Sequence, residues 1–389
     1  MTDPLAHLVV LDVATLNAAP QIATFFGDLG ACVLKVEHPR GDPLRQLTDA
    51  QGVALQWKLT NRNKRCITLD IGSKDGRALL ERLLVRADLL VSNLPATRLR
   101  LWELDADALR ARHPSLVSVN LTTYGTTGPW ADRAGSGTLA EAATGLANLT
   151  GPAAAPPTLA PVGLGDHLGV LHGIVAALTG LLVRESGGRS FDLSMTEPLL
   201  ALLGQRLAQV ARTGVDPGRR GNRFPTMAPR NTYRAADGRW IAITAGTDAL
   251  VARLFDVIGR PELRDDARFH TNAARLANVE ELDALIGAWV GARTAATAVE
   301  AFVAGHVSAA VVDDMTAVLA NPHFRARGEV LTVDDPEVGP LTTSRPGVGG
   351  LGAIRHFGRA LGADNETIYR EWLAVDPSAL TRLRAAGVI

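Results

Sequence analysis

The 389-residue sequence has few cysteines and no excess of charge of either sign. Its two cysteines, Cys32 and Cys66, lie in apolar, strand-like contexts, and there is no CxxC pair. We therefore expect two reduced core residues, which argues against a disulfide scaffold or a cysteine metal site. Lysine plus arginine and aspartate plus glutamate number 40 each. This balance argues against nucleic acid or an anionic membrane as the main partner.

Targeting signals and long hydrophobic runs are also lacking. The N-terminal residues show no basic segment followed by an apolar one, so we expect no signal peptide and a cytoplasmic protein. The longest apolar run, 168–183, contains His172 and three glycines and is short for a bilayer span. We interpret it as a buried core helix and expect no membrane contact.

Several familiar catalytic and nucleotide-binding motifs are absent. The sequence contains no HExxH, GxxxxGK[ST] or GxSxG, and its nine histidines show no metal-ligand spacing. We therefore expect no metal. A literal GxGxxG spans 347–352, but no apolar strand leads into it. Because a dinucleotide fingerprint needs a strand before it and a helix after it, we interpret this match as a turn.

The first 120 residues alternate between strand-like and helix-like segments. Continuous apolar strands separated by helices predict an α/β fold with a parallel sheet and right-handed crossovers. The strands expected in the chain are 8–13, 32–37, 66–70, 88–92, 116–121, 190–194 and 240–244. The expected helices are 20–29, 74–86, 105–112, 138–149, 166–185, 197–212, 248–258, 279–292 and 295–304.

The length of the chain exceeds what one hydrophobic core usually supports, so two domains are expected. We predict a large Rossmann-like domain from residues 1–212, completed by a return segment at 326–389. The stretch 213–230 is rich in Gly, Pro and Arg and is predicted to be a linker. Residues 231–325 are then predicted to form a smaller α/β domain.

Asp166 is the most informative residue, a lone carboxylate between close glycines. Gly163 and Gly165 let the backbone approach a ligand and leave its N–H groups accessible. At a helix N-terminus, the dipole and the free amides favour an ionised carboxylate. Such a group can attack an activated carbonyl. From these residues alone, Asp166 is either a nucleophile or an N-cap, a role that aspartate often takes.

Six segments, taken in order, resemble the class III CoA-transferase family, which includes formyl-CoA, carnitine-CoA and bile-acid-CoA transferases. They are 36–45, 61–70, 109–117, 124–133, 162–166 and 266–275. The resemblance implies a homodimer of interlinked rings and the transfer of CoA between an acyl-CoA and a carboxylic acid. Asp166 matches the family's catalytic aspartate, which forms a covalent aspartyl intermediate. This match favours the nucleophile over the cap.

The same resemblance implies where coenzyme A, the substrate, is bound. Family positions match Asn17, Ala18, His38, Leu69, Asp70, Ile71, Gly72, Asn93, Leu94, Pro95 and Arg133. Arg40, Arg45, Arg62 and Lys64 lie nearby in sequence and are either further phosphate contacts or solvated surface charges. Many members have an arginine where this chain has Leu101, so we expect Arg98 or Arg100 to make that contact.

The expected acyl site departs from the family pattern. Many members have Tyr-Asp followed by Gln, whereas this chain has Ser136 and Gly137, with Glu141 in the place of Gln. Glu141 is predicted either to bind or orient the acyl group, supported by Gly163 and Gly165, or to cap and pair structurally.

Two other functions remain open from the sequence. One is an acyl-CoA racemase or lyase that uses Asp166 as a base, and the other is a CoA-binding protein without catalysis. Racemases of this fold have a histidine at the place of Ser136, because a 1,1-proton transfer needs groups on both faces of the substrate. The serine disfavours racemisation, and His167, at a helix start, is expected to point away from Asp166.

Overall fold

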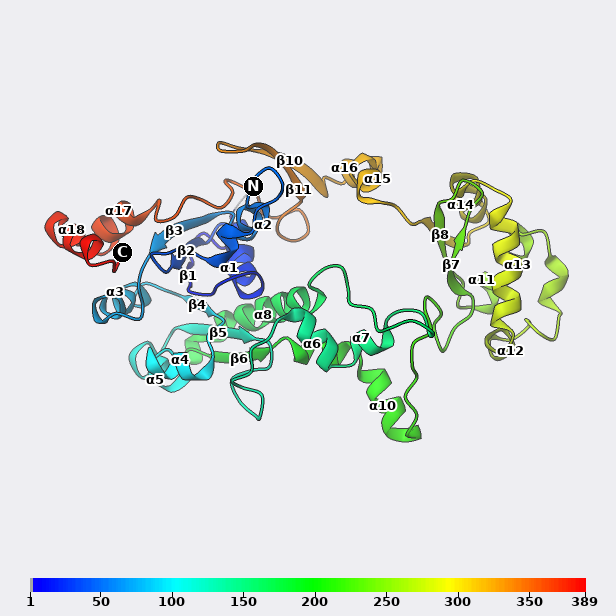
Figure 1. Cartoon of the computed structure of the whole chain (residues 1–389), viewed down its shortest axis with the longest axis horizontal. Helices are drawn as coiled ribbons and strands as arrows, with labels where there is room; N and C mark the ends of the chain where they lie inside the picture. Colours follow the sequence, from blue (N-terminus) through cyan, green and yellow to red (C-terminus); the bar gives the residue numbers. More distant parts are fainter. Residues whose placement is uncertain (1–2) are drawn as a thin grey trace. The chain divides into compact units, whose positions relative to one another are not determined.

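The computed structural model describes residues 3–389, which form two compact units. Unit 1 consists of the segment ending at Thr144 together with Ala160–Gln205 and Arg327–Ile389. Unit 2 consists of Gly145–Leu159 and Arg206–Ala326. Relative to the predicted domains, unit 2 begins at Arg206 instead of residue 231 and takes in 145–159. The chain therefore enters unit 2 twice and returns to unit 1 for its last segment (Figure 1).

A six-stranded parallel sheet organises unit 1, in the order β3-β2-β1-β4-β5-β6. This is the doubly wound order, in which the chain reverses direction across the sheet between β1 and β4. It confirms the predicted α/β class and parallel sheet. The strands are β1 Val9–Asp12, β2 Cys32–Glu37, β3 Lys64–Thr68, β4 Leu89–Ser92, β5 Val117–Thr122 and β6 Ser190–Ser194.

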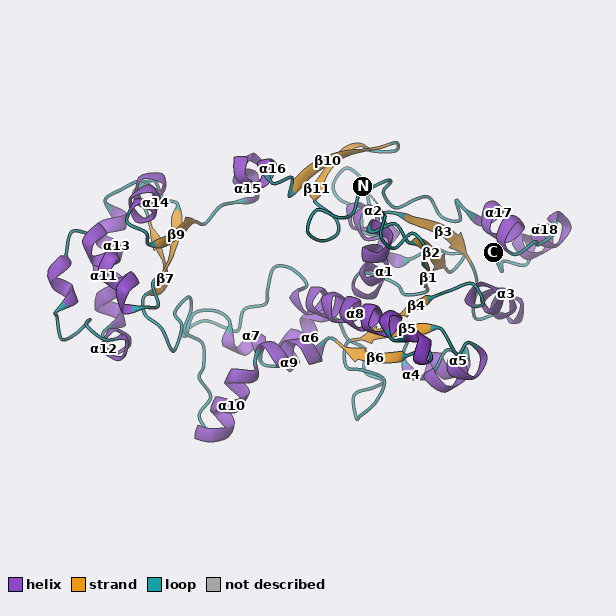
Figure 2. Ribbon diagram, turned by 180° about the vertical axis from the view of Figure 1, so that it is seen from behind, coloured by secondary structure: helices purple, strands orange, loops and turns teal. Residues whose placement is uncertain are grey.

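Helices cover both faces of this sheet (Figure 2). Helices α1 (Ala18–Asp28) and α8 (Leu164–Leu182) pack against each other and against β5. Leu11, Leu34 and Leu90 point to the opposite face and share a core with α3 and α18. The other helices of unit 1 are α2 Leu55–Thr60, α3 Lys74–Leu84, α4 Ala96–Leu101, α5 Ala106–Arg112, α6 Gly137–Ala143, α9 Thr196–Leu202, α17 Asn365–Thr367, the π-helical turn Ile368–Trp372 and α18 Pro377–Ala385.

Helix α8 lies against the sheet through a stripe of small residues. A Cβ on Gly180 would lie 2.7 Å from Cγ1 of Val117, and one on Gly169 would lie 3.2 Å from Cγ of Met195. The opposite side of α8 is exposed: Leu171 is 60% and Val175 63% accessible. The expectation of a buried core helix therefore holds for one side of α8 only, because only the small-residue side has packing partners. By length and composition alone α8 is apolar enough to cross a membrane, a test that core helices of globular proteins also pass.

Unit 2 has its own sheet and core. Its three strands pair antiparallel in the order β7-β8-β9, and Phe255, Ile286 and Phe302 are among the buried residues between sheet and helices. The elements are β7 Arg230–Arg234, β8 Trp240–Thr244, β9 Ser308–Val311, α7 Leu146–Leu149, α11 Asp248–Val257, α12 Asn272–Ala277, α13 Val279–Gly291, α14 Ala295–Ala304, α15 Met315–Ala320 and α16 Pro322–Ala326. Helix α10 (Gly204–Thr213) begins in unit 1 and continues into unit 2.

Several predicted elements differ from the structure. The predicted helix 138–149 is broken into α6 and α7 at Gly145, whose φ of 86° is left-handed. The predicted helix 197–212 is broken at Leu203 into α9 and α10. Strand β9 was not predicted, and neither was the antiparallel hairpin of β10 (Val330–Asp335) and β11 (Gly339–Ser344). The 347–352 glycines form a turn closed by a bridge between Val348 and Leu351, as predicted.

Candidate active site

A cavity of about 560 Å³ opens at the carboxyl ends of the parallel strands in unit 1. Its walls are the loops that follow β1, β2, β4, β5 and β6, together with the start of α2 and of α8. Adjacent loops leave in opposite directions where the strand order reverses, which is why open α/β sheets bind ligands at this edge. The lining residues are 15–18, Leu44, Leu47, Gln56, Asn93, Pro95, 121–125, 131–136, Asp166 and Met195.

Asp166 lines this cavity from the first turn of α8. It is the third residue of the helix, and Gly163 occupies the N-cap position. Asp166 is therefore not the N-cap, which removes the simplest structural explanation for the residue. Its carboxylate accepts hydrogen bonds from the backbone N–H of Gly137 and from the side chain of Asn17. Gln21 Nε2 in turn donates to Asn17 Oδ1 over 2.9 Å, which fixes the amide so that its NH2 group is free to face Asp166.

Glycine is required around this carboxylate because there is no room for larger residues. A Cβ on Gly137 would lie 2.5 Å from the backbone N of Asp166 and 2.7 Å from its Cγ. A Cβ on Gly165 would lie 2.6 Å from the carbonyl oxygen of Gly137, and one on Gly163 would collide with Asp166 Oδ2. Gly137 and Gly165 therefore let α6 and α8 meet closely, which places the N–H of Gly137 on the carboxylate, and Gly163 leaves room for the Asp166 side chain.

Burial raises the pKa of Asp166 above its usual range, because desolvation disfavours the charged form. The hydrogen bonds from Gly137 and Asn17 and the nearby His167 act in the opposite direction, and Glu141 adds to the rise in pKa. A carboxylate that is held by donors but only partly hydrated is more reactive than a fully solvated one. Asp166 is half-buried, so part of it remains accessible from the cavity.

Glu141 is buried and forms a hydrogen bond with the N-terminal turn of α8. Its side chain is 2% accessible, and Oε1 accepts a hydrogen bond of 3.0 Å from the backbone N–H of Gly165. That N–H is one of the donors that an α-helix leaves unpaired at its beginning. Glu141 does not line the cavity. Of the two roles predicted for it, the structure supports capping of α8.

Comparison with known proteins agrees with this geometry. Residues 5–350 match the family model described as CoA-transferase family III. The chain belongs to CoA-transferase family III. It is 34% identical to a succinyl-CoA–D-citramalate CoA-transferase of Chloroflexus aurantiacus, over 99% of this chain and 98% of the relative. A succinate–glutarate CoA-transferase of Agrobacterium fabrum is 29% identical over 84% of each chain. A CaiB/BaiF family protein from Brucella suis has a similar structure, with a TM-score of 0.81, 30% identity and coverage of 96% of this chain and 100% of that one.

In this family III CoA-transferase, five of the predicted CoA-binding residues line the cavity. They are Asn17, Ala18, Asn93, Pro95 and Arg133. The side chain of Asn93 connects two walls, because its amide donates to Thr15 O over 2.9 Å and accepts from Thr15 N over 3.0 Å. This pair holds the loop after β1 against the loop after β4.

The remaining predicted residues do not line the cavity. His38 Nε2 and Asp70 Oδ1 lie 4.0 Å apart and are both partly exposed. The residues outside the cavity wall are His38, Arg40, Leu69, Asp70, Ile71, Gly72, Leu94 and Arg100. Leu101 is 64% accessible, and the neighbouring Arg98 lies over the Trp102 ring. Their role in binding CoA stays a prediction.

Three of the extra cations proposed for the CoA phosphates have other partners. The guanidinium of Arg45 binds Glu37 at 2.7 Å, that of Arg62 binds Asp28 at 2.6 Å, and Lys64 Nζ binds Asp12 at 2.8 Å. Lys64 is fully buried, so it is neither a surface charge nor a phosphate contact. A short basic segment looks the same in sequence whether its charges are free or paired with distant carboxylates. The sequence therefore could not show that these three cations have partners within the chain.

Buried charges support the loop after β1. Lys35 Nζ lies 3.4 Å from Asp42 Oδ2 and hydrogen-bonds the carbonyl of Ala14. The carboxylate of Asp42 accepts the N–H of Leu16 at 3.2 Å, and Leu16 has a left-handed φ of 65°. A non-glycine residue keeps this conformation only where its surroundings impose it. The network therefore holds the cavity wall that precedes Asn17 in a fixed shape.

Sequence reasoning missed the aromatic wall of the cavity. Tyr124 lines it and makes an edge-to-face contact with Trp130, with ring centroids 5.2 Å apart. The guanidinium of Arg133 lies 4.5 Å from the Trp130 centroid, which orients Arg133 by a cation–π contact. The position of Tyr124, two residues after the end of β5, was the signal that could have found it. Within residues 3–389 there is no group of three or more His, Cys, Asp or Glu able to hold a metal ion.

Proposed function

We propose that this CoA-transferase moves CoA between an acyl-CoA thioester and a carboxylic acid through a covalent intermediate on Asp166. The observation that carries the proposal is the position of the Asp166 carboxylate. It faces the cavity at the topological switch point, is partly desolvated, and is held by Gly137 and Asn17.

In the proposed reaction an Asp166 oxygen attacks the thioester carbonyl carbon. The C–S bond breaks, CoA leaves as a thiolate, and a mixed anhydride remains on the enzyme. The thiolate then attacks the aspartyl carbonyl, which releases the donor acid as a carboxylate and leaves an aspartyl-CoA thioester. The acceptor carboxylate attacks the aspartyl carbonyl of this thioester, which breaks the C–S bond, expels CoA as a thiolate and forms a second mixed anhydride. The thiolate then attacks the acceptor carbonyl of this anhydride, so that the acceptor acyl-CoA is released, Asp166 is regenerated as a carboxylate and no water is consumed.

The residues around Asp166 have distinct roles in this scheme. Asn17, fixed by Gln21, keeps one carboxylate oxygen in place and favours the ionised form needed for attack. The His167 ring lies 2.8 Å from the carbonyl oxygen of Gly163, through Nδ1, in its own helical turn. This contact and the serine at 136 speak against a two-base racemisation at Asp166.

We infer further that donor and acceptor are small dicarboxylic acids. The relatives named above act on succinyl-CoA with D-citramalate and on succinate with glutarate. Arg133, in the cavity wall, supplies a positive charge that such an acid or the CoA phosphates would meet.

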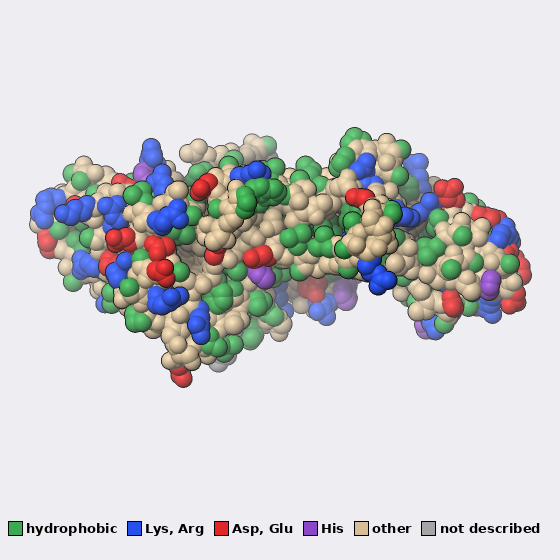
Figure 3. Space-filling model, turned by 90° about the horizontal axis from the view of Figure 1, so that it is seen from below, with side chains coloured by type: hydrophobic (Ala, Val, Ile, Leu, Met, Phe, Trp, Pro, Cys, Tyr) green, Lys and Arg blue, Asp and Glu red, His purple; other side chains and the backbone are tan. Residues whose placement is uncertain are grey.

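We propose that the enzyme acts as a homodimer, with the exposed side of α8 against a second copy. Leu171, Val175 and Leu182 leave 60%, 63% and 84% of their surface accessible along one helix. The space-filling view shows that hydrophobic side chains are exposed on one face of the molecule among charges of both signs (Figure 3). Light scattering on the full chain should give a dimer that Val175→Glu weakens, whereas Val85→Glu, at a 74% accessible valine, leaves it intact. A monomeric wild type would contradict this. Interlinking of the chains stays a prediction.

Intact-protein mass spectrometry tests the covalent step. Wild type, Asp166→Asn and Asp132→Asn are incubated with a panel of acyl-CoAs, with and without hydroxylamine, which cleaves an activated aspartyl adduct. Asp132 is the matched control because it is a second carboxylate in the cavity wall. We expect a CoA or acyl adduct on wild type and Asp132→Asn alone, and transfer reduced by roughly 10³-fold or more in Asp166→Asn. An adduct that persists in Asp166→Asn would refute the proposal.

A further inference from the structure

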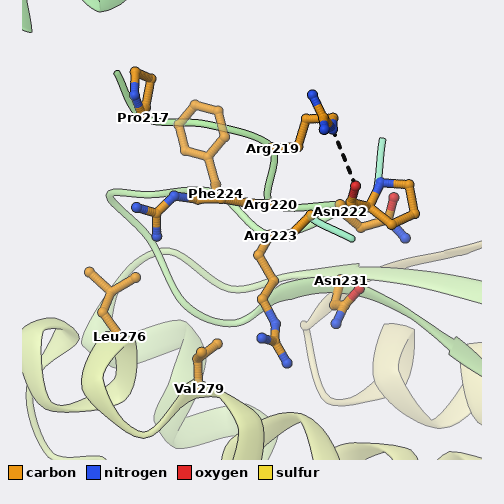
Figure 4. Close-up of a pocket in the computed structure, with 12 residues that line it drawn as sticks. Pro217, Arg219, Arg220, Asn222, Arg223, Phe224, Asn231, Leu276 and Val279 are labelled. Atoms are coloured by element: carbon orange, nitrogen blue, oxygen red, sulfur yellow. Dashed lines mark hydrogen bonds between the residues drawn. The ribbon is translucent and has the colours of Figure 1, made fainter. Parts of the chain in front are cut away.

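A second cavity, of about 600 Å³, lies within unit 2 (Figure 4). The loop 217–224 forms one side, and Leu276 and Val279 form the opposite side. This volume lies within the usual range for small-molecule sites. All its lining residues belong to unit 2, so the cavity is separate from the Asp166 site in unit 1.

Three arginines line this cavity, and they differ in how their charge is balanced. Arg223 is neutralised, because its Nε lies 2.8 Å from Asp283 Oδ2 and its Nη1 lies 3.5 Å from Glu280 Oε1. Arg219 and Arg220 form no ion pair with any carboxylate in residues 3–389. The cavity therefore carries two positive charges without counterions from the described chain.

Arg219 is held in place although it is not neutralised. Its Nε donates to Pro152 O over 3.3 Å (Figure 4), and its Nη1 lies 3.3 Å from both the carbonyl and the side-chain oxygen of Asn148. These neutral acceptors orient the guanidinium but leave its charge unpaired. An oriented guanidinium has little conformational entropy to lose when it binds a planar oxyanion.

The loop that carries these residues is braced by two more arginines. The guanidiniums of Arg206 and Arg230 lie 5.1 and 5.3 Å from the ring centroid of Phe224. Arg230 Nη1 also donates to Asn222 O over 2.7 Å. Arg206 on α10 and Arg230 on β7 thus add two positive charges around a loop that already carries Arg219 and Arg220. Like charges gathered around one short loop repel each other, and a bound anion relieves this repulsion.

We propose that this cavity is a binding site for an organic oxyanion, held through its carboxylate or phosphate groups by Arg219 and Arg220. The guanidinium fork binds either group through paired hydrogen bonds. Phe224, Leu276 and Val279 supply apolar surface for the body of the ligand. The volume is too large for a lone inorganic ion to fill.

Calorimetric titration of the full-length protein at physiological ionic strength tests the site, with succinate and pyrophosphate as separate probes. The variants are Arg219→Gln, Arg220→Gln and, as a matched control, Arg212→Gln, an exposed arginine of α10 that lines neither cavity. We expect at least one probe to bind, with affinity about tenfold weaker in each cavity variant and unchanged in the control. Succinate binding that weakens in the two cavity variants identifies a carboxylate site, and pyrophosphate binding that weakens in them identifies a phosphate site.

Arg220→Gln is the decisive variant, because the Arg220 side chain makes no hydrogen bond within the described residues and its loss does not loosen the loop. Unchanged melting temperatures show that the variants are folded. The inference is overturned if neither probe binds. It is also overturned if both bind to Arg220→Gln as to wild type, or if Arg212→Gln weakens binding as much as Arg220→Gln. Each of these outcomes leaves the Asp166 chemistry untouched.

Discussion

The carboxyl of Asp166 is subject to contacts that change its pKa in opposite directions. Burial raises the pKa, and the hydrogen bonds from Gly137 and Asn17 lower it. Nucleophilic attack needs the ionised form, so activity should fall as the pH falls through this raised pKa. The acid limb of the rate profile therefore reports directly on the environment of Asp166.

Asn17→Ala should move that limb to higher pH. The substitution removes a donor that stabilises the ionised carboxylate, so the pKa of Asp166 rises further. The measurement is kcat/KM against pH for wild type and variant with the same acyl-CoA. Gln56→Ala is the control, because Gln56 lines the same cavity but is not among the groups that influence Asp166. An unchanged limb in Asn17→Ala would show that the amide does not bind the reacting carboxylate.

Glu141 offers a contrast between charge and hydrogen bonding. In Glu141→Gln, the amide oxygen still accepts the Gly165 N–H, and the negative charge that raises the pKa of Asp166 is gone. We expect a folded enzyme whose acid limb moves to lower pH. In Glu141→Ala the buried N–H loses its partner, which should cost about 1–3 kcal/mol of unfolding free energy. Denaturant titration and pH profiles of both variants check this. Equal stability of the two would exclude the capping role.

The meeting of α6 and α8 depends on the absence of a side chain at position 137. Gly137→Ala places a Cβ 2.5 Å from the Asp166 nitrogen, so the helices must separate and the carboxylate must move. Displacement of a reacting group by about 1 Å reduces the rate by roughly 10²-fold. Gly204→Ala is the control, because a Cβ there meets nothing within 4 Å. Steady-state transfer rates are measured for both variants and for wild type. Full activity of Gly137→Ala would mean that the close packing of α6 on α8 is not needed to position the Asp166 carboxylate.

The sequence predicts best those elements whose pattern is strictly local. Strand 240–244 and helix 295–304 have the predicted bounds, because an apolar run and a helical stripe define them. Helix α8 starts earlier than expected, at Leu164, because Glu141, distant in sequence, caps it. Strand β7 was not predicted. It begins at Arg230, the last residue of the predicted linker, and its pairing with β8 outweighs an unremarkable local sequence.

The residues of the candidate site also divide into those that a local pattern predicts and those that depend on contacts distant in sequence. The glycines beside Asp166 single it out, because a carboxylate in such a run is locally unusual. Asn17, Asn93 and Arg133 came only from the resemblance, since no local pattern links three loops that meet across a sheet edge. Lys64 was wrongly expected to be free. Its partner, Asp12, is on a different strand, and pairing between strands cannot be read from a basic segment.

Each unit has its own core, so we expect each to unfold with its own transition. Phe302 is fully buried in unit 2 and packs on Trp289, with ring centroids 4.9 Å apart. Phe302→Ala should cost about 3–5 kcal/mol and lower one calorimetric transition while the other stays in place. Acyl-CoA binding measured below both transitions serves as the control. A single transition that moves as a whole would show that the two units unfold cooperatively.

The core beneath the parallel sheet includes Tyr369, Leu380 and Val388, and the carbonyl of Val388 accepts the N–H of Asp70 over 2.7 Å. A ribosome makes these residues long after the strands they cover. At about 5–20 residues per second, the sheet waits roughly ten seconds or more for its last packing partners. Residues 206–326 of unit 2 are synthesised during that interval, so the chain of unit 2 is complete before the last segment of unit 1 is made. The order of synthesis therefore lets unit 2 fold early, and it leaves the face of the sheet opposite to α8 accessible to chaperones until α18 has emerged.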